Sequence, residues 1–453
     1  MREYRVKRVM LLVAMVGALV AGTVQAAVWS LDTAALDLQG LERLKREPGV
    51  VDWMELGDRL LVAGEAGLSQ RWQERGLPAS EVRGMSDLEG TVLVLSKHSG
   101  VERILAKRTR VIAHEGPFFV IRPSGPALNR LLQEADHQLQ FVRAGRRTVV
   151  FRSPAHLASV APASAALAPI AGAVDKSRYT ETLRKLIAFK TRYTYSQAIQ
   201  QAAAWAVDAF KAAGCEAKVI PYTSRGKQLP NVVAELRGSA RPDEIYVVGA
   251  HLDSISWDSQ NSAPGADDNA SGSAGVIEMA RALAGRKPQA TIRFVLFSGE
   301  EQGLLGSIAL VNQMKSAGEL ARVKAMINLD MIAFDPTAPL DVMLEGKVIS
   351  HVLSDRLQAA AQAYAPALKV YRTDNAWGSD HVSFLDAGVP STLTIEYEYD
   401  GNGNEHSPKD VFEICNIDLA VAILRMDVAA LAELAGVATA FPTSGARRRS
   451  ASP

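Results

Sequence analysis

At 453 residues the chain is long enough for two domains with sizeable cores, and its hydrophobic fraction of 48% is that of an ordinary globular protein. The 50 Lys and Arg residues nearly balance the 49 Asp and Glu residues, so the charge implies neither nucleic acid nor an anionic membrane as a partner. The two cysteines, Cys215 and Cys415, are compatible with one disulfide in an exported protein or with two buried free thiols.

Residues 1–26 have the pattern of a secretory signal peptide. Arg2, Arg5, Lys7 and Arg8 precede an apolar run that starts at Val9, and small residues precede the expected cut after residue 26. The run is short for a membrane span, and no cysteine follows the expected cut to take a lipid. We therefore expect an exported protein, periplasmic or secreted, without membrane attachment after cleavage; an uncleaved anchor is the alternative.

Residues 28–155 predict a small α+β domain, with short apolar runs such as TVLVLSK, FFVIRPS and RRTVVFRS and a helix around RLLQEADHQL. Its histidines are scattered and form no ligand motif, so we expect a propeptide or an accessory domain and favour the propeptide. The following segment, 156–174, is rich in Ala and Pro with almost no charge, which predicts an extended linker.

Residues 175–438 alternate helical and strand patterns. A helix over TYSQAIQQAAAWAVDAFKAAG ends at Gly214, and the strands AKVIPY, NVVAELRG and EIYVVGAHL follow. Further strands are predicted at TIRFVLFS, AMINLDMIAF and STLTIEY, with helices between them and a last helix ending near Gly436. This order predicts an α/β fold with a mixed, mostly parallel sheet flanked by helices on both faces. Residues 439–453, with Arg447 to Arg449, are expected to be a flexible tail.

Two imidazoles and several carboxylates stand in short motifs at the ends of these predicted strands or in the loops that follow. The candidate ligands are His251, Asp267, Glu301, Asp330 and His406. Because carboxyl ends of parallel strands meet at one edge of a sheet, these nitrogen and oxygen ligands are expected to converge there. Such a set suits zinc or a similar divalent ion.

The number of ligands favours two metals. Each ion needs roughly three protein ligands, and a bridging carboxylate allows five residues to hold two ions about 3.5–4 Å apart. Glu300 is then left over as the candidate that takes a proton from water, because it directly precedes the ligand Glu301. Adjacent residues leaving a strand point to different sides, so one can bind metal while the other faces substrate.

At these motifs the chain resembles the M28 family of metallopeptidases, the two-zinc aminopeptidases of bacteria, over about residues 175–438. The resemblance implies the zinc exopeptidase fold. It also implies two zinc ions per chain, one held by His251, Asp267 and Glu301 and the other by Asp330, His406 and the shared Asp267.

The same resemblance implies further roles. Glu300 would act as general base and acid, and Asp253 would be the outer-shell carboxylate that orients His251. Asp268 would follow the bridging Asp267 across a strained peptide bond. The segment WGSDHVSF, with Asp380 and His381, is similar to one that lines the family's substrate cleft; an ordinary helix cap is the alternative for it.

The implied function is hydrolysis of the first residue from peptides with a free N-terminus. Met331, Phe334 and Trp377 are candidates for an apolar side-chain pocket. A glutaminyl-cyclase-like acyl transfer with one zinc, a carboxypeptidase activity and a non-catalytic binding ectodomain remain as alternatives on the same fold. The complete ligand set argues against the cyclase and against the ectodomain. Neither the preferred first residue nor the oligomeric state follows from the sequence.

Overall fold

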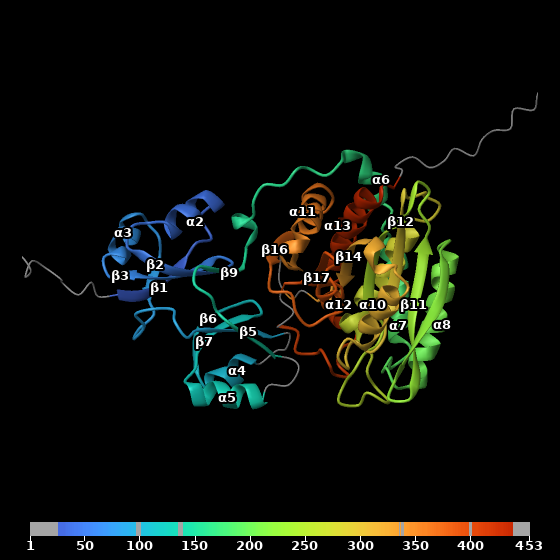
Figure 1. Ribbon diagram of the computed structural model, residues 1–453, viewed down its shortest axis with the longest axis horizontal. Coiled ribbons are helices and arrows are strands. Elements are labelled where there is room, and N and C mark those ends of the chain that lie inside the picture. The colour runs from blue at the N-terminus through green and yellow to red at the C-terminus, as the bar shows by residue number, and fades with distance from the viewer. Residues whose placement is uncertain are drawn as a thin grey trace, which may run out of the picture.

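The computed structural model describes residues 26–96, 101–134, 139–334, 336, 339–397 and 401–437. The expected signal peptide and the tail therefore lie outside the described residues, apart from the last signal residue, Ala26. Figure 1 shows a β-rich N-terminal unit on one side and a larger α/β unit on the other, joined by a segment that runs over the top. No helix of the described residues has the length and apolar character to cross a membrane.

The N-terminal unit contains two sheets. The first has the strand order β4-β1-β3-β2-β9 and the second has the order β6-β7-β5-β8. Their elements are β1 (Ala26–Asp32), α2 (Leu38–Lys45), β2 (Val50–Leu56), β3 (Arg59–Glu65), α3 (Leu68–Glu74), β4 (Ala79–Glu81), β5 (Val92–Ser96), α4 (Val101–Ala106), β6 (Arg110–Glu115), β7 (Phe118–Arg122), α5 (Gly125–Glu134), β8 (Leu139–Arg143) and β9 (Thr148–Phe151). The small α+β domain expected from the sequence thus consists of two stacked parts, and β9 returns the chain to the first sheet.

The Ala/Pro-rich segment is only partly extended. After the short 3-10 turn η1 (Pro154–His156), residues 157–164 have no regular structure, but η2 (Ala165–Leu167) and α6 (Ala168–Ala171) follow. Leu167 and Ile170 are buried in the core of the larger unit. The expectation of an extended linker over 156–174 is therefore wrong for its second half, because apolar side chains at helical spacing dock there.

The larger unit is built on an eight-stranded sheet with the order β10-β11-β13-β12-β14-β17-β15-β16. Its strands are β10 (Glu216–Ser224), β11 (Lys227–Leu236), β12 (Arg241–His251), β13 (Ala290–Phe297), β14 (Val323–Leu329), β15 (Asp341–Glu345), β16 (Lys369–Thr373) and β17 (Ser391–Glu396). The neighbours β13-β12-β14-β17 pair in parallel, whereas β10, β11 and the β15–β17 pair are antiparallel. The predicted mixed α/β sheet is confirmed.

Helices cover both faces of this sheet, as predicted. They are α7 (Lys176–Ile187), α8 (Gln197–Ala212), α9 (Gly272–Ala282), α10 (Leu305–Ser316), α11 (His351–Tyr364), α12 (His381–Asp386) and α13 (Ile417–Ala435), with the short turns η4 (Leu320–Arg322), η5 (Val348–Ser350) and η7 (Phe412–Ile414). Helices α7, α8, α9, α11 and α13 pack on one face, and α10 and α12 pack on the other. The strands β12 and β13 are buried on both sides between these layers.

The two cysteines do not pair. Cys215 is buried just after α8, and Cys415 is half-buried at the end of η7; both are free thiols. Burial raises the pKa of Cys215 to about 12, so this thiol stays protonated and unreactive at neutral pH. The disulfide alternative from the sequence is therefore wrong. The alternative of two buried free thiols is correct for Cys215, whereas the free thiol Cys415 is only half-buried.

Candidate metal centre and active site

Three neighbouring parallel strands deliver the first group of site residues to one edge of the sheet. His251 is the last residue of β12, Asp330 directly follows β14, and Glu300 and Glu301 lie in the turn after β13. Because β12 pairs in parallel with both β13 and β14, the three strand ends lie side by side. The convergence expected from the sequence is therefore present.

Asp268 lies between the two imidazoles. It belongs to the π-helical segment η3 (Ala266–Ser271) before α9, where its backbone is not helical (φ −104°, ψ 90°). Its Oδ1 is 3.1 Å from Nε2 of His251, and its Oδ2 is 3.0 Å from Nε2 of His406. One carboxylate thus joins two histidines that are far apart in the sequence.

Each imidazole also faces a carboxylate of its own. Nε2 of His251 is 3.1 Å from Oδ1 of Asp330, and Nε2 of His406 is 3.0 Å from Oε2 of Glu301. The structure therefore pairs His251 with Asp330 and His406 with Glu301. The sequence expectation had these partners exchanged; the correction rests on these two distances, since both β13 and β14 are direct neighbours of β12 and strand order alone does not decide the pairing.

Asp267, the expected shared carboxylate, is turned away from the imidazoles. Its Oδ1 accepts a hydrogen bond from the backbone N–H of Ala333 (2.9 Å), and its Oδ2 accepts one from the side-chain amide of Asn402 (2.9 Å). The peptide bond between Asp268 and Asn269 is cis. The sequence analysis assigned the shared carboxylate to Asp267. The structure contradicts this assignment, because Asp268 lies between the two imidazoles instead.

Asp410 holds the backbone of this aspartate pair. Its two carboxylate oxygens accept the N–H groups of Asp267 (2.9 Å) and Asp268 (3.0 Å). Asp410 is buried and stands four residues after His406, so the loop that supplies the late histidine also supports the shared carboxylate. Asp410 was not among the residues predicted for the site, although it stands in the motif EHSPKD.

The charge in the cluster is strongly unbalanced. Burial alone would lower the pKa of His251, but the carboxylates of Asp330, Asp253 and Asp268 outweigh it and raise that pKa well above its ordinary value. The pKa of His406 is raised in the same way, against the effect of burial, by Glu301 and Asp268. Burial and the neighbouring Asp268 carboxylate raise the pKa of Glu301 to about 7. So many acids in one buried place favour a bound cation.

The donor set fits zinc. Zn–N and Zn–O bonds of about 2.0–2.2 Å place two ligand atoms of one tetrahedral zinc about 3.3 Å apart, close to the 3.0–3.1 Å separations observed. One ligand atom from each of His251, Asp268 and Glu301 lies within 4.8 Å of the other two. The buried Oε1 of Glu301 has no hydrogen-bond partner among the described residues, as expected of a ligand oxygen.

Asp253 supports the centre from behind. Nδ1 of His251 lies 3.1 Å from the backbone carbonyl of Asp253, which can only accept, so Nδ1 carries the proton of the neutral ring and Nε2 is left for a metal. The Asp253 carboxylate is farther from the ring (3.7 Å) and instead accepts the N–H groups of Glu300 and Glu301 and the hydroxyl of Thr194. Asp253 therefore orients the histidine mainly through its main chain, and its side chain fixes the Glu300–Glu301 turn.

Glu300 lines the cavity together with the ligand cluster. It is half-buried, and burial together with the carboxylates of Glu301, Asp330 and Asp380 raises its pKa well above the ordinary value, against the opposing effect of His251. Such an environment suits a carboxylate that accepts and returns a proton during a reaction.

The cavity above the centre has a volume of about 270 Å³. Its lining residues are His251, Asp268, Glu300, Glu301, Gly303, Leu304, Asp330, Met331, Trp377, Gly378, Val382, Glu405 and His406. Met331 and Trp377 thus line it as predicted, whereas Phe334 does not. Sequence analysis missed Leu304, Val382 and Glu405, because nothing in their local pattern distinguishes them from core or loop residues.

Asp380 and His381 are buried at the start of α12 and do not line the cavity. The expected cleft-lining role therefore belongs to their neighbours Gly378 and Val382. Ser379 was also missed: its hydroxyl donates to Oδ2 of Asp330 (2.6 Å) and accepts from the amide of Asn328 (2.8 Å), which fixes the orientation of Asp330.

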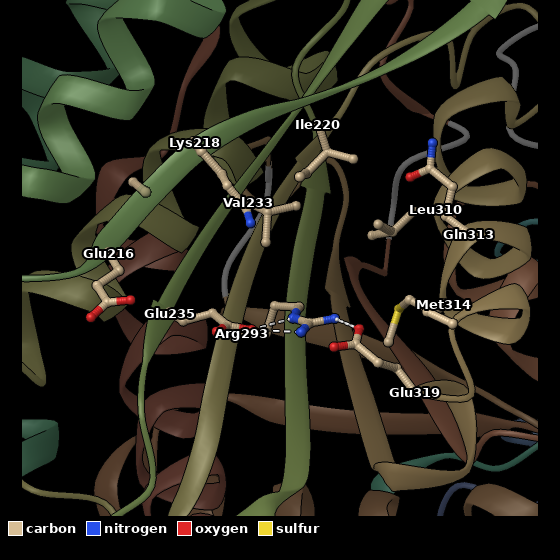
Figure 2. A pocket seen from close by; sticks show the side chains of 12 residues that line it. Glu216, Lys218, Ile220, Val233, Glu235, Arg293, Leu310, Gln313, Met314 and Glu319 are labelled. Carbon is tan, nitrogen blue, oxygen red and sulfur yellow. Dashed lines mark hydrogen bonds and ion pairs between the residues drawn. The ribbon is translucent and has the colours of Figure 1, made fainter.

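A larger cavity, of about 430 Å³, lies elsewhere, between the edge strands and α10 (Figure 2). At its floor Arg293 is bonded to Glu235 (2.6 Å) and to Glu319 (3.0 Å), as the dashed lines show. The one buried charge is thus already neutralised by two acids, and the cavity offers no metal-ligand cluster. The ligand cluster therefore identifies the smaller cavity as the candidate site.

Comparison with known proteins agrees with this location. Peptidase family M28 matches residues 231–431. A probable leucine aminopeptidase from Arthroderma otae is 32% identical over 288 residues, which cover 60% of this chain and 76% of that protein. A probable zinc metalloprotease from Pyrenophora tritici-repentis is 32% identical over 51% of this chain and 65% of its own length.

Two solved structures share the fold. LapB from Legionella pneumophila has a TM-score of 0.56 and 22% identity, covering 76% of this chain and 99% of that one. BSAP, a zinc aminopeptidase from Bacillus subtilis, has a TM-score of 0.50 and 18% identity, covering 58% of this chain and 95% of that one. At these identities the likeness shows the fold alone.

Proposed function

Because this chain belongs to peptidase family M28, we propose that it is an exported aminopeptidase that removes the first residue of a peptide with the help of two zinc ions. The resemblance stated from the motifs is confirmed at the level of the family and of a zinc-dependent peptidase. The number of metals, the residue roles and the export belong to the proposal.

One observation carries the proposal of two metals: both oxygens of Asp268 are used, one toward each imidazole. His251, Asp268 and Asp330 form one half-site, and His406, Asp268 and Glu301 form the other. A single ion would use one of these sets. The histidine and the acid of the other set would then lie close together without a cation between them. A shared carboxylate between two complete sets supports two adjacent ions.

When bound, such ions would acidify a water molecule and polarise the carbonyl of the substrate. The protein's own residues do the rest. Glu300 takes a proton from the attacking water and returns it to the departing amine; burial and the neighbouring carboxylates raise its pKa, which favours the uptake of that proton. The hydrogen bonds from the backbone of Glu300 and Glu301 to Asp253 hold this base beside the centre. No covalent intermediate is needed.

The substrate side of the proposal rests on the cavity. It is closed at the centre by acids, which favours a positively charged α-amine, and walled by Met331, Trp377, Leu304 and Val382, which favours a large apolar first side chain. Two relatives, the probable leucine aminopeptidase from Arthroderma otae and leucine aminopeptidase 1 from Pyrenophora teres, carry names that agree with such a preference.

The test of the proposed function uses Glu300→Gln, with zinc content and hydrolysis of leucine amide measured on the same preparation. Glutamine keeps the shape but cannot accept a proton, so we expect two zinc ions per chain and a turnover lower by about 10²–10⁴-fold. Glu181→Gln, at an exposed position of α7, is the matched control and should behave as wild type. Normal turnover in Glu300→Gln would exclude Glu300 as the base.

The same preparations separate the alternatives. One zinc per chain together with cyclisation of N-terminal glutamine would indicate the cyclase reaction instead. Cleavage of amino-blocked but not of carboxyl-blocked peptides would indicate a carboxypeptidase. Export is tested by fractionating cells that express the full chain and by sequencing the N-terminus of the mature protein, which we expect to begin after residue 26.

A further inference from the structure

We propose that the N-terminal unit, residues 26–156, is a permanent part of the enzyme that sets its preference for the first residue of the substrate, because it holds the pocket wall formed by Met331 and Trp377. This inference rests on the proposed function. The residues that position this pocket wall are Val150 and Phe151 of β9, together with Asn375 of the larger unit.

Strand β9 joins the two units through the main chain. Arg152, directly after β9, and Arg372 of β16 exchange both backbone hydrogen bonds (2.7 and 3.1 Å) in an antiparallel bridge. Figure 1 shows β9 and β16 side by side at the junction. Because β9 also pairs with β2, this isolated bridge links the edge of the first sheet of the N-terminal unit to the edge strand of the large sheet.

The carbonyl of Val150 anchors the loop that carries Trp377. It accepts hydrogen bonds from the hydroxyl of Thr373 (2.6 Å) and from the side-chain amide of Asn375 (2.8 Å). Asn375 lies two residues before Trp377, which lines the cavity. A backbone group of the N-terminal unit thus fixes the start of a pocket-forming loop.

Aromatic packing supports the same wall. The ring of Phe151 lies 6.3 Å from that of Tyr371 and 6.0 Å from that of Tyr397, measured between ring centroids, and the two tyrosines stack at 3.8 Å. A Cβ on Gly116, in the turn between β6 and β7, would lie 3.0 Å from the ring of Tyr397, so that turn also approaches closely.

The N-terminal unit also completes the core of the large sheet. Met343 of β15 pairs with Ile395 of β17. The side chains of Met343, Ile395 and Leu393 lie on the same face of the sheet as α10 and α12, which cover the neighbouring strands. These side chains and Met331 form one buried cluster with residues of the N-terminal unit, such as Val120 and Phe151, and Trp377 packs against it. Without that unit, the apolar face of β15 and β17 would be open to water. Removal of the unit as a propeptide would therefore expose apolar surface, which argues for a permanent domain.

The N-terminal unit supports the cavity wall from outside and contributes none of the described lining residues. All residues that line the cavity lie between His251 and His406, so within the described part of the chain no side chain of the N-terminal unit enters it. A propeptide that blocks the site would be expected to fill the cavity. The match to LapB covers 76% of this chain, more than the 58% matched by BSAP, so the shared fold extends beyond the metallopeptidase unit.

The first experiment cuts the linker. A recognition sequence for a site-specific protease is inserted between Ser159 and Ala163, in the stretch without regular structure, and the purified full chain is then nicked. We expect the two pieces to elute together, with kcat/KM for leucine amide within twofold of the uncut protein. Separation of the N-terminal piece with a rise in activity, or with unchanged activity and preference, would overturn the proposal.

The second experiment changes one contact. Asn375→Ala removes the amide that bonds to Val150, and Asn312→Ala, at an exposed position of α10, is the matched control. For Asn375→Ala we expect KM for leucine and phenylalanine amides to rise by about tenfold, with zinc content, kcat and KM for alanine amide unchanged. An unchanged ratio between large and small residues contradicts the proposal, as does an equal loss on all amides with loss of zinc. A wild-type protein that hydrolyses no amide at all would instead contradict the proposed function.

Discussion

At the scale of single residues, the arrangement depends on which of two adjacent aspartates faces the histidines. Asp268 reaches both imidazoles, whereas Asp267 is held by Ala333 and Asn402 on the other side. Both are buried, and both lie in the same short motif, so exchange of their roles would need a rotation of the whole segment that Asp410 clamps.

This difference predicts opposite effects of two conservative substitutions. Asp268→Asn should lose zinc and reduce turnover by about 100-fold or more, since even outer partners of metal ligands are worth about 10–100-fold. Asp267→Asn should keep both ions, because neither oxygen of Asp267 faces an imidazole and the amide oxygen can still accept one of the two hydrogen bonds. Metal analysis of the two purified variants after identical dialysis checks this. Loss of zinc from Asp267→Asn alone would restore the assignment made from the sequence.

Asp410→Ala provides a second test at this scale. It removes the acceptor for the backbone N–H groups of Asp267 and Asp268 without touching an imidazole. We expect zinc affinity to fall by about 10–100-fold, with turnover recovered when zinc is supplied in excess. A chelator titration followed by activity measures it. An affinity equal to that of wild type would mean that Asp410 supports only the fold.

Much of the site was predictable from residue types, and the geometry was not. The motifs around His251, Glu300, Asp330 and His406 identify strand ends and loops, which is why these residues were found. The choice between Asp267 and Asp268 depends on backbone angles at Asp268 that no residue pattern specifies. Ser379 and Asp410 were missed because their roles come from contacts between distant segments, and a serine or aspartate in a loop has many other uses.

At the scale of elements, long segments with a clear period were predicted well and short ones were not. Helices α8, α9, α10, α11 and α13 and strands β10 to β14 and β17 lie at the predicted places. Strands β15 and β16 and helix α7 were not predicted. The two strands have only five residues each, and α7 is strongly polar on its exposed side, so their patterns are weak until the sheet and the core are known.

Helix α13 contains a buried acid that makes stability depend on pH. Burial raises the pKa of Asp427 well above its ordinary value, although the hydrogen bond with Thr394 opposes this. The Thr394 hydroxyl has one proton and lies 3.1 Å from the carbonyl of Asn328 and 3.0 Å from Asp427. One hydroxyl proton cannot serve both acceptors, so both hydrogen bonds are present together only when a protonated Asp427 donates to the Thr394 oxygen.

Asp427→Asn should therefore be stabilising at high pH. With a raised folded pKa, the folded wild type holds a proton that the unfolded chain has lost, so its free energy of unfolding falls as pH rises above about 4. Asparagine supplies the same donor without titrating. We expect similar melting temperatures for variant and wild type at pH 4 and a melting temperature for the variant about 2–4 °C higher at pH 8. A variant that is less stable than wild type at pH 8 contradicts a neutral Asp427.

At the scale of the whole molecule, the metal centre ties together loops from distant parts of the sequence. The ligands come from the ends of β12, β13 and β14, from η3 and from the loop after β17, and their carboxylates repel one another without a cation. Zinc should therefore stabilise the folded chain, by about 2.7 kcal/mol for an ion present at 100 times its Kd.

Removal of zinc by a chelator should lower the melting temperature and abolish hydrolysis, and readdition of zinc should restore both. Differential scanning calorimetry of the apo and zinc-loaded full chain measures the shift. The chelator must also be tested on the apo protein, where it should change nothing. Equal melting temperatures with and without zinc would mean that the acids are accommodated in some other way.

The central claim is that one carboxylate, that of Asp268, stands between two metal ions. A crystal structure of the zinc-loaded protein, with anomalous diffraction data on both sides of the zinc absorption edge, tests it most directly. We predict two anomalous peaks about 3.5–4 Å apart, one beside His251 and Asp330 and one beside His406 and Glu301, with an oxygen of Asp268 toward each. A single peak, or two peaks joined by a residue other than Asp268, would contradict the account.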